Sequence, residues 1–144
     1  MSRPTDKRSD IDRFRANYAD ELEGAALYRA LADAEKDPAA KEVFARLASV
    51  EEAHSTFWAK KIGELGEKLP HTRPGFRTRA LSYLARRFGP AFVLPTVMGA
   101  EVRDSNRYAD QPDAVAAGLA ANFEIPAVLV NVAVIAEFYL QRRK

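Results

Sequence analysis

The feature that most constrains the fold is a helical spacing of apolar residues that recurs along most of the chain. In the first such segment, alternating steps of four and three join Phe14, Tyr18, Glu21, Ala25, Tyr28 and Ala32. This spacing places the side chains on one face of a helix, as in a helix that packs in a bundle. No segment of the sequence has the period-two alternation of a strand. The pattern predicts an all-α fold.

Prolines and capping residues set the expected helix boundaries. Asp37 is a good N-cap and Pro38 suits the first position of a helix, so the first helix should end near Lys36. Gly89 and Pro90 should end a short amphipathic helix with Phe76, Ala80, Leu84 and Phe88 on its apolar face. The predicted helices are residues 9–36, 38–64, 76–88, 91–109 and a last helix that Pro112 opens and Pro126 kinks.

The composition fits one domain. The chain has 144 residues, of which 47% are hydrophobic, so we expect a single helical domain over 1–144, with a flexible N-terminus at 1–9. Its longest apolar run, 125–140, is shorter than the ~20 residues of a membrane-spanning helix and should be a core helix. We see no signal peptide and expect the protein in the cytoplasm, either free or at the inner face of the membrane.

Glutamates interrupt three of the apolar stripes. Glu21 lies within the first stripe, whereas Glu23 falls off it and should be solvated. The second stripe contains Glu51 and His54, together with Phe44, Leu47 and Trp58. The third contains Glu101, together with Leu94, Val97, Ser105 and Tyr108. A buried carboxylate must be neutralised, paired or bound to a cation. One such residue could be a protonated or arginine-paired core residue, and a lone histidine is more often a core residue. Three glutamates and a histidine together indicate a metal site.

Two tyrosines repeat the same spacing. Tyr28 follows Glu21 by seven residues and Tyr108 follows Glu101 by seven, which is two helical turns along one face. Each is a candidate hydrogen-bond donor to a side chain that binds the metal. Ordinary core packing is the alternative explanation for both tyrosines and is slightly favoured.

Two stretches of the sequence carry a resemblance. "DELEGAALYRALADAEKDP" and "VFARLASVEEAHSTFWAKKI", with "LARRFGPAFVLPTVMGAEVRDSNRYADQPDA" after them, resemble the rubrerythrin-type ferritin-like domains. They are most similar to the version found N-terminal to vacuolar-iron-transporter-like membrane proteins, the membrane-bound ferritins. The resemblance covers about residues 10–117. It implies a ferritin-like four-helix bundle with an extra short helix between helices 2 and 3, and two iron ions held by glutamates and Glu-x-x-His pairs.

The implied ligands match the stripes except in the last helix. By position they are Glu21, Glu51, His54 and Glu101, around one or two iron ions, with manganese or zinc as alternatives. Where a second Glu-x-x-His pair is expected, this sequence has Asn131 and Val134, and neither Glu124 nor Glu137 can replace it. The site could therefore be mononuclear, decayed, or completed by a second chain, and 112–144 is an atypical fourth helix.

Two functions from different classes follow. The first is iron binding with ferroxidase- or peroxidase-type iron oxidation; no catalytic residue is assigned, and whether the chain is an enzyme stays open. The alternative is a non-catalytic interaction or dimerisation module with a degenerate metal site. We expect a homodimer or a higher homo-oligomer.

A basic stretch suggests one further partner. No acidic residue occurs between Lys68 and Ala100, and the 76–88 helix suits association with a membrane surface about as well as simple solvation. The stretch is short and has no nucleic-acid motif, so we expect no nucleic-acid partner. In the related proteins a membrane domain follows the ferritin-like part.

Overall fold

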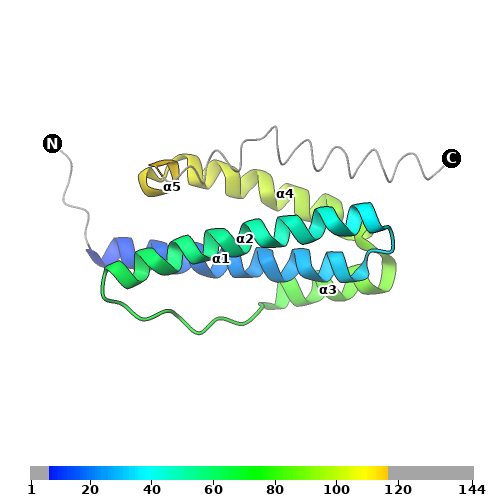
Figure 1. Ribbon diagram of the computed structural model, residues 1–144, viewed down its shortest axis with the longest axis horizontal. Coiled ribbons are helices and arrows are strands. Elements are labelled where there is room, and N and C mark those ends of the chain that lie inside the picture. Colours follow the sequence, from blue (N-terminus) through cyan, green and yellow to red (C-terminus); the bar gives the residue numbers. More distant parts are fainter. Residues whose placement is uncertain (1–6, 117–144) are drawn as a thin grey trace. The chain divides into compact units, whose positions relative to one another are not determined.

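The computed structural model describes residues 7–116 and confirms the all-α class. The described elements are five helices, α1 (Lys7–Ala34), α2 (Pro38–Glu64), α3 (Phe76–Phe88), α4 (Pro90–Ala109) and α5 (Pro112–Ala116) (Figure 1). No strand occurs within 7–116. The predicted boundaries that fall within 7–116 agree to within two residues, the usual uncertainty at helix ends.

The chain divides into two compact units after Arg86. The first contains α1, α2 and most of α3, and the described part of the second contains the end of α3, α4 and α5. The prediction of one domain over 1–144 stays a prediction, because much of the expected fourth helix, with Glu124, Pro126, Asn131, Val134 and Glu137, lies outside the described residues.

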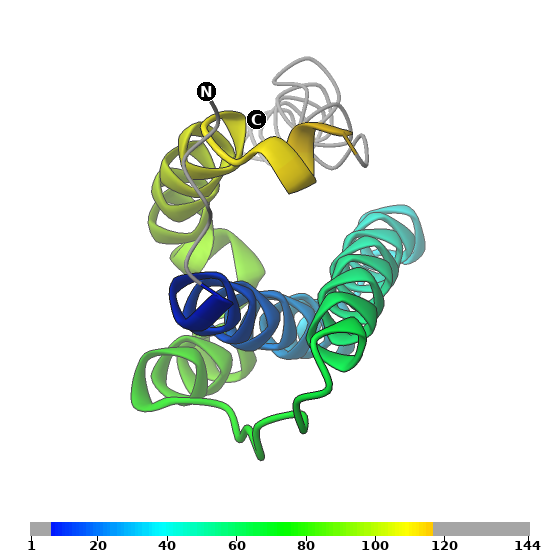
Figure 2. The same ribbon diagram turned by 90° about the vertical axis from the view of Figure 1, so that its left-hand side faces the viewer.

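The core of the first unit is the contact between α1 and α2. Asp37 caps α2 as predicted: its side chain accepts hydrogen bonds from the backbone N–H of Ala39 and Ala40, at 3.0 and 3.1 Å. The connection of only three residues forces α1 and α2 to run antiparallel, and Figure 2 shows them as neighbours. The most deeply buried apolar side chains of the pair are Leu31, Phe44, Ala48, Trp58 and Ile62.

The short helix α3 is held by a side chain of α1. The Glu23 carboxylate accepts hydrogen bonds from the backbone N–H of Gly75, at 2.6 Å, and from the Thr78 hydroxyl. It thus satisfies donors at the first turn of α3, as a capping side chain does. The expectation that Glu23 is simply solvated was wrong, because the loop returns α3 to the flank of α1.

The predicted apolar face of α3 was also wrong. Phe76 is 85% exposed and Phe88 56% exposed. The buried side chains of α3 are instead Thr78, Leu81, Ser82 and Ala85. Three of these four are small, whereas the rings of Phe76 and Phe88 are exposed.

No helix within the described part of the chain combines the length and the apolar character needed to cross a membrane.

Candidate metal centre

Three of the predicted site residues meet in the interior between α1 and α2. Glu21 lies near the middle of α1, and Glu51 and His54 lie one turn apart near the middle of α2. Their exposed fractions are 2%, 8% and 2%. The antiparallel pairing brings the midpoints of the two helices together, so the glutamate-bearing stripes face each other at the same depth.

The ligand atoms of this cluster are close enough to share an ion. One ligand atom from each of Glu21, Glu51 and His54 can be chosen so that all three lie within 4.8 Å of one another. The Nδ1 atom of His54 is 3.4 Å from Oε2 of Glu21. We call these three residues the α1/α2 cluster.

The spacing can be compared with that around a bound ion. Two ligands ~2.1 Å from a metal are roughly 3.0 to 3.4 Å apart in octahedral or tetrahedral geometry and at most ~4.2 Å apart across it. The 3.4 Å separation of His54 and Glu21 fits this range. The upper limit of 4.8 Å slightly exceeds the largest separation expected around a bound ion, so the most separated ligand atoms would move closer to each other on binding. Two carboxylates and an imidazole form a donor set suited to iron, manganese or zinc.

A glycine that the sequence reasoning missed gives Glu51 its position. A Cβ atom built on Gly24 would lie 2.7 Å from Oε2 of Glu51 and 3.1 Å from its Cδ. Glu51 therefore reaches the backbone of α1 only because residue 24 has no side chain. A glycine inside a helix costs ~1 kcal/mol relative to alanine. Its occurrence one turn after Glu21 is the signal that could have identified it.

The surroundings of the cluster are apolar with a few polar side chains. Tyr28 is buried, as the stripe predicts, and its role as a hydrogen-bond donor to a ligand stays a prediction. Asn17, one turn before Glu21, is 2% exposed and was not predicted. Trp58 packs against Phe14 with 5.5 Å between ring centroids. This apolar boundary lowers the local dielectric and strengthens interactions among the buried charges.

The remaining predicted residues lie outside what can be described. The backbone of α4 includes positions 101 and 108, but the side chains of Glu101 and Tyr108 are not among those described. Their predicted roles stay predictions. Residues 131 and 134 lie beyond the described range.

Comparison with protein-family models, with curated proteins and with solved structures finds no match to this chain. The feature of the described residues that bears most on function is the convergence of Glu21, Glu51 and His54 at a buried point.

Proposed function

We propose that the chain is a ferritin-like domain of the rubrerythrin type that binds iron through Glu21, Glu51 and His54, with oxidation of that iron as its activity. The observation that carries the proposal is the burial of two carboxylates and an imidazole within 4.8 Å of one another. The resemblance of residues 10–117 to that family supports the choice of iron. Glu101, the fourth ligand expected from the sequence, is part of the proposal.

The charge of the cluster supports binding of a cation. Two carboxyl groups share one buried site, and repulsion between buried like charges is expensive when both are ionised. A divalent ion bound between them would reduce this repulsion. Hard oxygen ligands stabilise the higher-valent state of a bound iron ion, which is the chemistry that iron would supply here.

Each residue of the α1/α2 cluster, like several of its neighbours, has a specific role in this proposal. Glu21 and Glu51 supply negative charge and oxygen ligands from opposite helices, and His54 supplies a nitrogen ligand. Gly24 leaves room for Glu51 beside α1. Trp58 and Phe14 exclude water from that part of the helix pair. Packing of α1 against α2 brings the three side chains close together before an ion arrives, as preorganised sites require.

Titration of the protein with ferrous ion under anaerobic conditions, measured by calorimetry, tests the proposal. We expect a stoichiometry nearer one ion per chain than two, because Asn131 and Val134 replace the second Glu-x-x-His pair. Glu51→Gln should weaken binding by more than about 100-fold, since loss of an outer-shell partner alone costs up to that amount. Glu101→Gln should also weaken binding if Glu101 is a ligand.

Glu52→Gln is the matched control. Glu52 is adjacent to Glu51, but its side chain is 44% exposed and pairs with Arg29, so this substitution should leave the affinity unchanged. Two tight sites per chain in a monomer would show that the fourth helix was misread. Absence of ferrous binding would favour the alternative, an interaction module with a degenerate site.

A further inference from the structure

The outward side of α3 carries exposed aromatic rings. Phe76 is 85% exposed and Tyr83 is 64% exposed. The two positions are seven residues apart, so both rings lie on the same side of the helix, about 10 Å apart along its axis. Large apolar side chains grouped on a surface commonly mark an interaction site.

Arginines lie on both sides of this aromatic pair. Arg77, Arg79 and Arg86 are all exposed. At 100° per residue, Arg79 flanks the rings on one side and Arg77 on the other. We call these four residues the α3 outer face; they are Phe76, Arg77, Arg79 and Tyr83.

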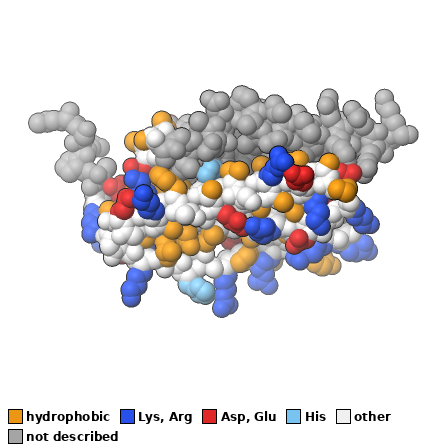
Figure 3. Space-filling view, viewed as in Figure 1, with side chains coloured by type: hydrophobic (Ala, Val, Ile, Leu, Met, Phe, Trp, Pro, Cys, Tyr) orange, Lys and Arg blue, Asp and Glu red, His pale blue; other side chains and the backbone are white. Residues whose placement is uncertain are grey.

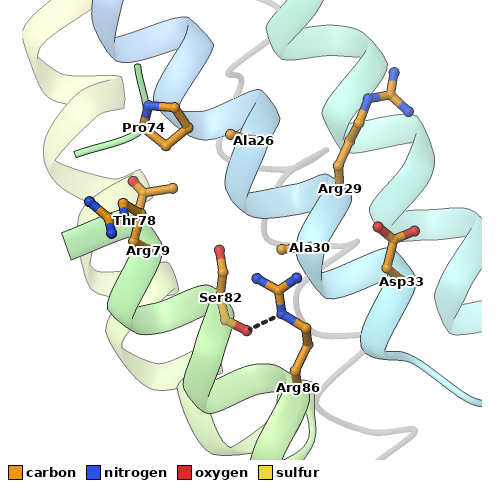
Figure 4. A pocket seen from close by; sticks show the side chains of 9 residues that line it. All are labelled: Ala26, Arg29, Ala30, Asp33, Pro74, Thr78, Arg79, Ser82 and Arg86. Carbon is orange, nitrogen blue, oxygen red and sulfur yellow. Dashed lines mark hydrogen bonds between the residues drawn. The ribbon is translucent and has the colours of Figure 1, made fainter. Parts of the chain in front are cut away.

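The acidic groups near α3 lie on its inner side. Glu23 is engaged at the first turn by Gly75 and Thr78. Asp33 lines the groove between α1 and α3, where Figure 4 shows Arg86 directed toward α1 and Arg79 extending away from it. The sequence contains no acidic residue from Lys68 to Ala100. In Figure 3, basic side chains project along the lower edge of the view, where the loop before α3 and α3 itself lie.

We infer that the α3 outer face docks on an anionic lipid surface. A helix lying in a membrane interface places aromatic rings ~5–10 Å deep at the headgroup boundary while arginines contact the lipid phosphates and carboxylates. The α3 outer face provides both groups on one convex surface. An acidic protein partner would match the arginines, but it would also need a pocket for each of two projecting rings.

The test is sedimentation of the full chain with phosphatidylcholine vesicles, with and without phosphatidylserine. We expect binding only to the vesicles that contain phosphatidylserine. Salt at about 1 M, where the Debye length is ~3 Å, should release the protein. The double variant Arg77→Gln/Arg79→Gln should bind more weakly by roughly fivefold for each arginine removed. Phe76→Ser/Tyr83→Ser should also lose binding, and since both rings are exposed this variant should fold normally.

Two controls remove exposed basic side chains and an exposed apolar side chain from α2 instead. Lys41 and Lys60 are exposed there, and Val50 is 40% exposed. Lys41→Gln/Lys60→Gln and Val50→Ser should bind the vesicles as the wild type does. The inference is overturned if phosphatidylserine gives no binding, or if the α2 variants lose as much binding as the α3 variants. Capture by soluble polyglutamate without any vesicle binding would also overturn it and would indicate an acidic protein partner.

Discussion

Neighbouring glutamates of the helix pair lie in opposite environments. Glu21 and Glu51 are buried with His54 between α1 and α2, whereas Glu23 and Glu52, one or two residues away, lie nearer the surface. The outer pair has ordinary protein partners: Glu23 accepts from Gly75 and Thr78, and Glu52 accepts from Arg29 at 2.5 and 2.8 Å. The inner pair is buried, with ligand atoms of Glu21, Glu51 and His54 within 4.8 Å of one another. This contrast separates carboxylates that support the fold from carboxylates suited to hold a cation.

Gly24→Ala should produce the largest effect on the inner pair without changing a ligand. The added methyl group would meet the Glu51 carboxylate at 2.7 Å and push it from the cluster. We expect ferrous affinity to fall by about tenfold or more, comparable to the loss of an outer-shell partner. Calorimetric titration measures it.

Gly63→Ala is the matched control. Gly63 lies in α2, and a Cβ atom built on it would have no neighbour within 4 Å. The substitution should raise the free energy of unfolding by roughly 0.5–1 kcal/mol and leave the affinity unchanged. Equal ferrous affinity in both alanine variants would mean that Gly24 does not position a ligand.

Glu23→Ala should change stability and not metal binding. It removes the carboxylate that satisfies donors at the start of α3, and loss of a capping side chain costs about 1 kcal/mol. Urea denaturation of the apoprotein measures this cost, and ferrous titration should give the wild-type affinity. A large loss of ferrous affinity would mean that Glu23 contributes to metal binding, as the inner pair is proposed to do.

Glu52→Gln should have the smallest effect. The pair formed by Glu52 and Arg29 is about half exposed, and exposed ion pairs contribute roughly 0.2–1 kcal/mol, less at high salt. Urea denaturation at low and high salt should show a small difference that shrinks with added salt. A loss of several kcal/mol would contradict the description of Glu52 and Arg29 as an exposed ion pair.

Local signals predicted the helices well. Asp37 and Pro38 define the start of α2 by chemistry confined to three residues, and the structure has the expected cap. The positions of Glu21, Glu51 and His54 were also predictable, because helical periodicity places each on a buried stripe and the short connection aligns the two helices.

Features that depend on another element were not predictable. The face that α3 buries carries Thr78, Ser82 and Ala85, and Thr78 donates a hydrogen bond to Glu23 of α1. Counting apolar residues selected the wrong side. Gly24 matters only because Glu51 of the opposite helix approaches it. No periodicity in one helix reports such a contact.

Thermal unfolding of the wild type and of Glu51→Gln, each with and without ferrous ion under anaerobic conditions, tests the central claim most directly. Metal at a hundredfold excess over its dissociation constant should stabilise the wild type by ~2.7 kcal/mol, because it binds only the folded state. Glu51→Gln should lose this response, while its metal-free form should be as stable as the wild type or more so, since one buried negative charge is gone. The account is contradicted if the wild type does not respond to metal and Glu51→Gln is at least as stable under every condition.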